Sequence, residues 1–472
     1  MAHIRLFKHY IRTPYIILAL VEACAIVGAV YLAELLRHIH EPYAWYYLSL
    51  GLLAPACWVA FVLLACNLAM SVYAAQLKEG FSGMLVRSLV SFCLLGSVAL
   101  YLSNVAMPPV ALEQGLTSTI IVISLVLVLL IRAVFFRLVD AQRLRRRVVI
   151  VGAGAKAKQI WDSVNRTSGQ RAFELVGFIP CEAAARQVDP SLLIDLQEPL
   201  VDYVRRHRID EVVVAPDDRR LGFGGRVTMN QLLDCKMNGA DVVEAIAFCE
   251  KELTLIELTL LNPGWIIFSD GFQYNAVRSW AKRGFDIFAS SLLLVLTWPI
   301  MLAAAFAILL ESGVRQPVLY RQVRTGLNGE PFELLKFRSM RTDAEKDGAV
   351  WARQNDDRVT RVGRFIRSSR IDELPQIYNV LKGEMSFIGP RPERPEFVAD
   401  LMREIPYYTE RHRVKPGLMG WAQLCYPYGA SVEDAAQKLR YDLYYIKNHS
   451  MLLDTLIVVQ TIEVVLVGHG AR

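Results

Sequence analysis

The chain has 472 residues, a length that fits two or three domains. Hydrophobic residues make up 54% of the chain and charged residues 21%, and its mean hydropathy is +0.30. This composition is too apolar for an ordinary soluble protein and too charged for one that lies wholly in a membrane, so we expect a membrane anchor with water-facing domains. The net charge of +6 suits anionic membrane surfaces and phosphorylated substrates without identifying either. The eight cysteines form no CxxC pair, which argues against a disulfide framework and a zinc site.

Four apolar runs open the chain, and each is long enough to cross a hydrocarbon core of about 30 Å. They cover residues 14–36, 45–73, 84–102 and 117–136. Basic residues precede the first run and are dense after the fourth, whereas the loop at 103–116 has no Lys or Arg. The positive-inside rule therefore predicts a four-helix transmembrane bundle, residues 1–140, with both ends in the cytoplasm. Glu22, Glu34 and Arg132 fall within or near these runs, and a transport path, helix-end snorkelling or interhelix pairing accounts for them.

A Rossmann-like α/β domain is predicted next, at residues 146–261. A β-branched strand leads into Gly152, Gly154 and Ala157, which have GxGxxA spacing, and a helical pattern follows. Further strand-like runs lie at 174–179, 211–215 and 240–243. The second strand runs into Pro180 and Cys181, with no acidic residue to hold a ribose. A nucleotide pocket and a structural or regulatory remnant both stay open, and the remnant is the default.

A fifth apolar run covers residues 284–310 and has Pro299 near its middle. Basic residues flank it on both sides, and the proline divides it into pieces too short to cross a bilayer. These features favour a kinked re-entrant helix, residues 278–312, that enters and leaves the membrane on one face. A spanning helix is the alternative, and it would place the rest of the chain outside the cell.

The stretch at 363–393 carries the strongest chemical signal. Its acid pair, Asp372 and Glu373, lies between an arginine-bearing segment and a Gly-Pro-Arg-Pro turn at 389–392. Carboxylates can hold Mg²⁺ or attack phosphorus, and guanidinium groups can clamp phosphoryl oxygens, so we interpret this stretch as an active site. The apolar spacing after the acid pair predicts a helix that ends at Gly383, with Asp372 as its N-cap. The alternative is that Asp372 only caps this helix.

The segments around this stretch are predicted to be ordered. Residues 321–341 indicate a hairpin whose second strand presents Lys336 and Arg338, either as a solvated face or as an anion cradle. Helices are expected at 394–409 and 431–448, and the tyrosines of the second favour a place at the bilayer surface. The apolar tail at 451–467 fits a buried helix, a pair of strands or a membrane contact.

From Lys282 onward the chain resembles the bacterial sugar transferases, the monotopic phosphoglycosyl transferases that begin polysaccharide and glycoconjugate assembly. The matching motifs are KRGFD at 282–286, Pro299, KFRSMR at 336–341, IRSSRIDELPQIYNVLKGEMSFIGPRP at 366–392 and KPGLMGWAQ at 415–423. The bundle with its Rossmann-like domain is similar to the large polyprenyl-phosphate hexose-1-phosphate transferases. RPERPEF, YPYGASVEDA and YDLYYIKNHS are similar to exopolysaccharide enzymes linked to exosortase systems.

The resemblance implies a multi-pass protein of the bacterial inner membrane with a cytoplasmic catalytic domain, small and α/β, at 313–472. It implies transfer of a hexose 1-phosphate from a UDP-sugar to undecaprenyl phosphate, with release of UMP, to initiate exopolysaccharide synthesis. The route would be covalent, through a phosphosugar on Asp372, which also binds Mg²⁺ and has Glu373 as its catalytic partner. The resemblance assigns phosphate binding to Arg367, Arg391, Lys336 and Arg338. It assigns a structural role to Pro299 at the helix kink and to Pro390 and Pro392 in the turn.

The implied partners are the UDP-sugar, undecaprenyl phosphate and the lipid bilayer, with no nucleic acid. A homodimer through the Rossmann-like domain is left open. The alternative function is a membrane sensor or scaffold whose Rossmann-like domain binds a nucleotide without catalysis. One departure from the family concerns the kink, where Trp298 stands before Pro299 in place of the frequent serine.

Overall fold

The computed structural model describes most of the chain, and everything below refers to these residues. They are 3–6, 9–40, 50–70, 80–106, 115–138, 146–166, 173–180, 186–217, 227–269, 271–272, 276–313, 315–342, 344, 357–426, 429 and 431–467. The chain divides into two compact units, Met1–Phe248 and Cys249–Arg472, and each is described by itself.

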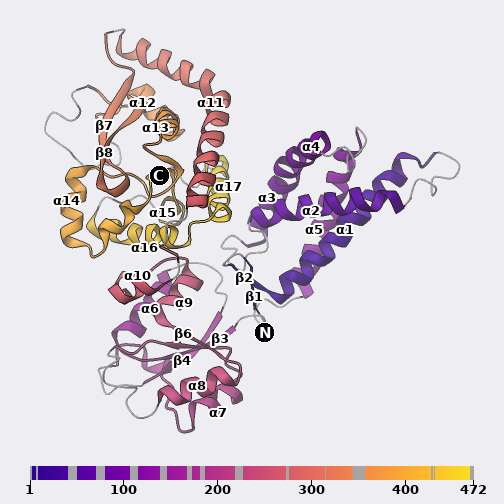
Figure 1. The fold of residues 1–472 in the computed structure, drawn as a ribbon, viewed down its shortest axis with the longest axis vertical. Helices are drawn as coiled ribbons and strands as arrows, with labels where there is room; N and C mark the ends of the chain where they lie inside the picture. Colours follow the sequence, from indigo (N-terminus) through magenta and orange to yellow (C-terminus); the bar gives the residue numbers. More distant parts are fainter. Residues whose placement is uncertain are drawn as a thin grey trace. The chain divides into compact units, whose positions relative to one another are not determined.

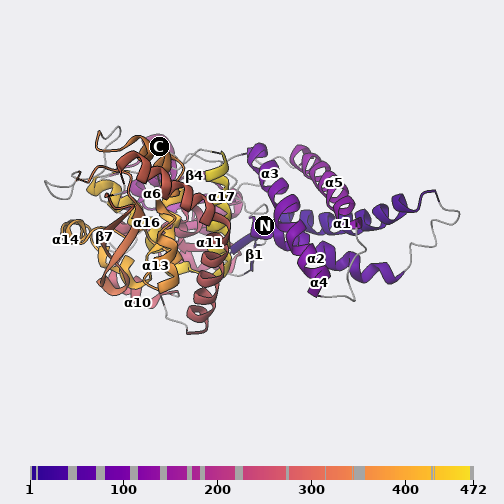
Figure 2. The same ribbon diagram turned by 90° about the horizontal axis from the view of Figure 1, so that it is seen from above.

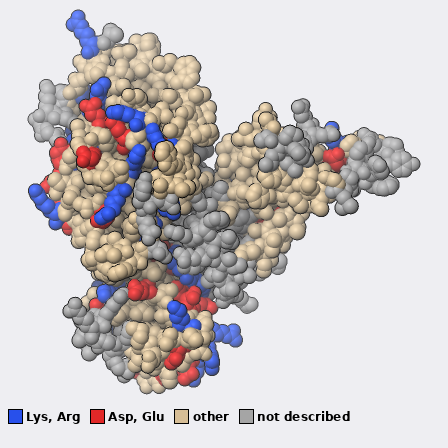
Figure 3. Space-filling model, viewed as in Figure 1, with Lys and Arg blue, Asp and Glu red and all other residues tan. Residues whose placement is uncertain are grey.

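The first unit begins with an apolar helical bundle. Its elements are β1 (His3–Leu6), β2 (His9–Arg12), α1 (Thr13–Arg37), the short helix η2 (Leu50–Leu52), α2 (Leu53–Ala69), α3 (Gly80–Leu89), the π-helical segment η3 (Val90–Gly96), α4 (Ser97–Ala106) and α5 (Leu116–Leu138). The short strands β1 and β2 pair antiparallel. Helix α1 lies beside both α2 and α5 (Figures 1 and 2), and their apolar side chains share one core. On the face drawn in Figure 3, the surface of this bundle is largely uncharged.

Four described helices are long and apolar enough to cross a membrane. They are Ile16–Arg37, Arg87–Val105, Leu116–Phe135 and, in the second unit, Ala276–Ser312. The predicted run at 45–73 contributes the shorter apolar helix Leu53–Leu68, and parts of this run lie outside the described residues. The chain is thus membrane-associated in character, as its composition indicates.

The acidic and basic residues within the bundle pair with each other. Arg132 Nε and Nη2 donate to the two carboxylate oxygens of Glu22, at 2.6 and 2.8 Å, and both side chains are fully buried. Arg132 Nη1 also donates to Ser88 Oγ. Of the three interpretations of these charges, interhelix pairing is the one that the structure shows for Glu22 and Arg132.

A parallel α/β domain completes the first unit. Its elements are β3 (Arg146–Val151), α6 (Ala155–Arg166), β4 (Phe173–Ile179), η5 (Pro190–Leu192), α7 (Leu200–Arg206), β5 (Glu211–Val214), α8 (Met229–Met237), β6 (Asp241–Glu244) and α9 (Ala245–Leu253), whose end belongs to the second unit. The strands are parallel in the order β4-β3-β5-β6. Figure 1 shows α6 and α9 on one side of the sheet and α7 and α8 on the other.

The second unit is a small mixed domain. Its elements are η6 (Leu258–Leu260), α10 (Pro263–Phe268), α11 (Ala276–Ser312), β7 (Leu319–Thr325), η7 (Leu327–Gly329), β8 (Pro331–Phe337), α12 (Arg361–Ser368), η8 (Ile371–Glu373), α13 (Gln376–Lys382), β9 (Ser386–Ile388), α14 (Pro395–Glu404), η9 (Tyr408–Arg413), β10 (Gly417–Met419), α15 (Trp421–Cys425), α16 (Val432–Asn448) and α17 (Met451–Val467). Strands β7 and β8 form the predicted hairpin, and β9 pairs with β10 in parallel. The apolar tail is the single helix α17.

Helix α11 continues through Pro299, and Figure 1 shows that it bends along its length. Both of its ends contact the same domain. Near the start, Asp286 accepts hydrogen bonds from Ser386 Oγ and Phe387 N, each at 2.9 Å. Near the end, Ala304 and Ile308 pack in one cluster with Phe337 and Ile366. Between these contacts the helix exposes large apolar side chains, among them Val295, Leu296, Trp298 and Leu302.

Tyr445 of α16 is buried within the domain, so it does not support the expectation that this helix lies at the bilayer surface. This side chain is only 2% exposed, and its hydroxyl bonds Asp454 of α17 and the carbonyl of Ile388. Tyr444 is half-buried against the ring of Trp421. These rings pack within the domain because α16 has neighbours on most of its sides, which its sequence pattern does not reveal.

Candidate active site

The acid pair lies on a 3₁₀ turn between two helices. Residues Ile371–Glu373 form η8, and Arg370, which precedes it, has a left-handed backbone with φ of 58°. Helix α13 begins only at Gln376 and has Pro375 at its N-cap. Gly383 closes its end, and this end was predicted. The expectation that Asp372 is the N-cap of this helix is therefore wrong. Glu373 N donates to Arg370 O and Leu374 N to Ile371 O, each at 3.2 Å, so the chain tightens into a 3₁₀ turn before the α-helix starts.

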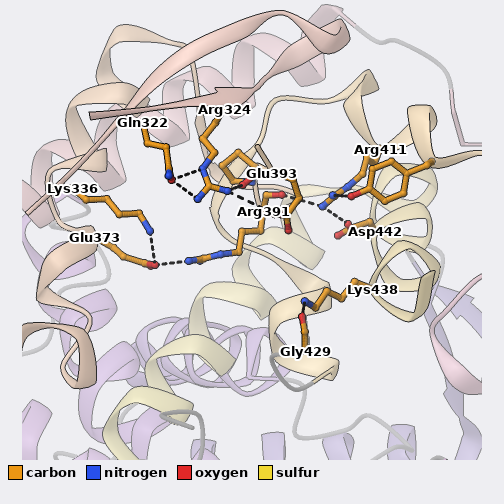
Figure 4. Close-up of polar contacts among 12 residues, drawn as sticks. Gln322, Arg324, Lys336, Glu373, Arg391, Glu393, Arg411, Gly429, Lys438 and Asp442 are labelled. Atoms are coloured by element: carbon orange, nitrogen blue, oxygen red, sulfur yellow. Dashed lines mark hydrogen bonds and ion pairs between the residues drawn. The ribbon is translucent and has the colours of Figure 1, made fainter. Parts of the chain in front are cut away.

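Glu373 is held by basic groups that come from three segments. Its Oε1 lies 2.6 Å from Arg391 Nη2, 3.5 Å from Lys336 Nζ and 3.7 Å from Arg370 Nη1. Figure 4 shows Lys336 and Arg391 approaching this oxygen from different directions. Burial alone would raise the pKa of the Glu373 carboxyl, but the charges of Arg391 and Lys336 outweigh burial and hold the pKa well below its usual range. Glu373 is therefore a fixed anion that organises two cations.

Asp372 has different surroundings. Its side chain is 8% exposed, and among the described residues no hydrogen bond or ion pair engages its carboxylate. Burial raises the pKa of Asp372, and the negative charge of Glu373 raises it further. Lys336, Arg367 and Arg391 lower this pKa without cancelling the rise. The site thus holds one carboxylate that is already paired and a second that is available to a ligand.

The predicted phosphate-binding residues do not all gather at this point. Lys336 projects from β8 onto Glu373, and burial lowers its pKa although Glu373 partly opposes this. Arg367, in the last turn of α12, is close enough for its charge to act on Asp372. Arg338 instead donates from Nη1 to Gln316 at 3.3 Å, and within the described residues no hydrogen bond or ion pair joins it to either acid. Its predicted role has the least structural support.

The turn that carries Arg391 is fixed through its main chain. Pro390 and Pro392 have no N–H groups, so other segments hold this turn mainly by its carbonyl oxygens. The bonds run from Gly389 N to Met419 O (2.8 Å), Gly417 N to Pro390 O (2.9 Å), Arg411 Nη2 to Arg391 O (3.0 Å), Arg324 Nη1 to Pro392 O (3.1 Å) and Thr325 N to Glu393 O (2.9 Å). A turn anchored at five successive residues gives the Arg391 side chain a rigid base.

Sequence reasoning missed Arg324, Arg411 and Asp442, all of which Figure 4 places around this turn. Arg411 pairs with Asp442 across 2.9 Å, and both side chains are buried. Arg411 stands in a basic run beside Arg413, which pairs with Glu410 at the surface. Nothing in the local spacing distinguishes the buried arginine from the exposed one, so only the fold could identify it.

The glycine-rich loop of the α/β domain bonds a carboxylate of its own chain. Ala155 N donates to Asp217 Oδ2 and Lys156 N to Asp217 Oδ1, each at 2.8 Å, at the start of α6. Gly154 has room only for hydrogen, because a Cβ there would lie 1.9 Å from Asp217 Oδ2. In dinucleotide-binding proteins this position at the helix N-terminus holds a phosphate. The glycine spacing is therefore explained by internal contacts, which favours the structural interpretation; Cys181 lies outside the described residues.

The fold and the site together define a membrane-associated protein with a paired acid and arginine centre suited to phosphate groups. The family model described as bacterial sugar transferase matches residues 277–468. UDP-glucose:undecaprenyl-phosphate glucose-1-phosphate transferase of Escherichia coli is 40% identical over 322 residues, which cover 67% of each chain. The chain belongs to the bacterial sugar transferase family.

Two further relatives carry different names. UDP-N-acetylgalactosamine-undecaprenyl-phosphate N-acetylgalactosaminephosphotransferase of Aeromonas hydrophila is 50% identical over 198 residues, 42% of this chain and 46% of that protein. Undecaprenyl-phosphate glucose phosphotransferase of Komagataeibacter xylinus is 36% identical over 337 residues, 68% of this chain and 59% of that protein. The chain thus spans about half the length of these two relatives, and their names specify different sugars.

Proposed function

We propose that this protein transfers a hexose 1-phosphate from a UDP-sugar to undecaprenyl phosphate, releasing UMP, as the initiating step of exopolysaccharide synthesis. The observation that carries the proposal is the asymmetry of the acid pair. Glu373 forms ion pairs with Arg391 and Lys336. The carboxylate of the adjacent Asp372 has no hydrogen-bond or ion-pair partner among the described residues. The relatives named above are phosphotransferases that act on undecaprenyl phosphate, which supports the same chemistry here.

The reaction proceeds in two displacements at the sugar-bearing phosphorus. An Asp372 oxygen forms a bond to this phosphorus, and the bond between the phosphorus and the bridging oxygen breaks, so that UMP leaves with the electron pair. An oxygen of undecaprenyl phosphate then attacks the same phosphorus and releases the Asp372 carboxylate. Arg391 and Arg367 bind the non-bridging phosphoryl oxygens, where negative charge is concentrated. Glu373 keeps Arg391 and Lys336 oriented during both displacements.

The residues present fit a Mg²⁺ ion that is shared with the substrate. Mg²⁺ is usually held by one or two carboxylates together with substrate phosphates rather than by a cage made only of protein groups. Asp372 would be the protein ligand, since its carboxylate is not engaged by the described residues around it. When bound, the ion would neutralise charge on the diphosphate of the donor.

The lipid acceptor requires a site at the membrane surface, and α11 would anchor the catalytic domain there. Contacts of both Asp286 and Ile308 with the same catalytic domain support a helix that leaves the membrane on the face where it entered. The exposed apolar side chains between these contacts would lie in lipid. We place the catalytic domain on the cytoplasmic side of the bacterial inner membrane, where UDP-sugars are made.

The covalent step is tested with the purified full-length protein, Mg²⁺ and a UDP-sugar in the absence of lipid. We expect the peptide that contains Asp372 to gain the mass of a hexose phosphate, and the Asp372→Asn variant to gain none. Turnover with lipid should fall about a thousandfold or more in this variant, as expected for loss of a nucleophile. The exposed carboxylate Asp400 provides a control, since Asp400→Asn should retain turnover. An active Asp372→Asn variant would refute the assignment.

A further inference from the structure

The buried pair of Arg411 and Asp442 lies one step behind the proposed phosphate-binding arginine. Arg411 is 6% exposed and Asp442 2%, and they come from η9 and α16, respectively. Burying an ion pair costs desolvation energy, which mutual attraction and further hydrogen bonds must offset. Stability alone is thus a weak reason for such a pair, and its other contacts indicate what it does.

Arg411 uses its guanidinium to connect three groups. Nη1 donates to the Tyr408 hydroxyl at 2.6 Å, and Nη2 lies 2.9 Å from Asp442 Oδ2. The same Nη2 donates to the carbonyl of Arg391 at 3.0 Å. The planar guanidinium is held by Asp442 and Tyr408 in the orientation that reaches this carbonyl (Figure 4).

The carbonyl that Arg411 binds belongs to the residue whose side chain reaches the acid pair. Arg391 Nη2 donates to Glu373 Oε1 at 2.6 Å, and Glu373 directly follows Asp372 in the chain. A connected path therefore runs from Asp442 through the ion pair to Arg411, the hydrogen bond to the Arg391 carbonyl and the Arg391 side chain to Glu373. The adjacent anchors at Pro390 and Pro392 restrain the turn, and the Arg411 bond restrains it at Arg391 itself.

We propose that Arg411, oriented by Asp442 and Tyr408, is a positioning residue that sets the main chain of Arg391 and thereby aims its guanidinium at the phosphate of the donor. The inference rests on the proposed function, because Arg391 is a phosphate-binding group only within it. Among the described residues, Arg411 has no hydrogen bond or ion pair with Asp372 or Glu373, so its route to the site is the carbonyl of Arg391. Losing the bond should displace the Arg391 side chain and lower kcat more than it changes KM for the UDP-sugar.

The test is a double-mutant cycle between Arg411→Lys and Arg391→Lys in the full-length protein, with lipid-dependent UMP release as the readout. Lysine keeps the charge opposite Asp442 but cannot form the same forked set of bonds. We expect Arg411→Lys to lower kcat by about 100-fold, the scale of a misplaced catalytic group. In the Arg391→Lys background the same substitution should cost almost nothing more, because the group it positions is already gone.

The control is Arg413→Lys on the same short helix. Arg413 pairs with Glu410 at the surface, so this substitution should leave kcat unchanged. If Arg411→Lys does not fold, Tyr408→Phe replaces it, since it removes one anchor of the guanidinium and keeps the ring. Losses that multiply in the double variant would overturn the inference, because they would mean that Arg411 acts independently of Arg391. Absence of turnover in the unmodified protein would overturn the proposed function and this inference together, so the two failures are distinguishable.

Discussion

Asp372 and Glu373 are neighbours in the chain, yet their surroundings shift their pKa values in opposite directions. Arg391 and Lys336 lower the pKa of Glu373, whereas burial raises that of Asp372. Such divergence between two carboxyl groups is a general way in which enzymes assign different roles to similar residues. Here it separates a permanent anion, which orders the cations, from a carboxylate that, in the proposed mechanism, must be ionised to attack phosphorus.

This difference predicts the acid limb of the pH profile. Only ionised Asp372 can attack, and a raised pKa means that it becomes protonated at a higher pH than an ordinary aspartate. Lys336→Met removes a positive charge that lowers this pKa, so the acid limb of kcat/KM should move to a higher pH. Lys382→Met is the matched control, because Lys382 pairs with Glu384 at the surface and should leave the limb in place. An unchanged limb in Lys336→Met would contradict the electrostatic account.

At this scale the sequence predicted the identities of the central residues but not their arrangement. The adjacent acids and the Gly-Pro-Arg-Pro turn can be recognised in the sequence by their residue types. Only the structure shows that Arg391 and Lys336 both contact Glu373. Whether a basic residue reaches the site depends on strand register and on distant elements, so Arg338 and Arg411 could not be placed. The N-cap expectation failed because a 3₁₀ turn and the start of an α-helix have the same apolar spacing over a few residues.

Among the elements, α6 has its first N–H groups bonded by the carboxylate of Asp217. Asp217→Ala would expose the N–H groups of Ala155 and Lys156, and it should lower the free energy of unfolding by about 1 kcal/mol, as loss of an N-cap does. Inorganic phosphate should then raise the melting temperature of this variant more than that of the unmodified protein. Asp189→Ala, which removes an exposed cap at η5, is the control. Equal effects of phosphate on both proteins would show that Asp217 does not occupy an anion position.

Helix α11 gives a second prediction at this scale. With the eight native cysteines replaced, single cysteines at Val277 and Arg315 mark its two ends, and both positions are exposed. In inside-out membrane vesicles, a membrane-impermeant maleimide should label both if the helix is re-entrant. A helix that spans the membrane would leave one of the two unlabelled, and this result would contradict the topology proposed here.

Element types were easier to predict than element surroundings. The period of the apolar residues indicated the parallel strands, the hairpin and most helices, because backbone geometry alone sets that period. The tail at 451–467 stayed undecided since its apolar residues lie on every side, and such a pattern fits several structures. The burial of Tyr445 depends on Asp454 and Ile388, which come from other elements, so the pattern of α16 alone could not reveal it.

For the whole molecule, apolar helices occur in both compact units, in the bundle of the first and as α11 in the second. A chain anchored in this way can hold a phosphate-directed site near lipid, so that in the proposed reaction the UDP-sugar arrives from water and the lipid acceptor from the membrane. In the proposed function, the choice of sugar depends on contacts that no motif encodes, and the names of the relatives specify different sugars. A panel of donors is therefore part of any functional measurement.

The most direct test of the account is UMP release by the detergent-purified full-length protein with Mg²⁺ and a panel of UDP-sugars, with and without undecaprenyl phosphate. We predict sustained release with one donor that requires the lipid, and a single stoichiometric burst when the lipid is absent. Asp372→Asn should abolish both. Release that is as fast in Asp372→Asn as in the unmodified protein, or no release with any donor from folded protein, would contradict the central claim that Asp372 carries the sugar phosphate between the two substrates.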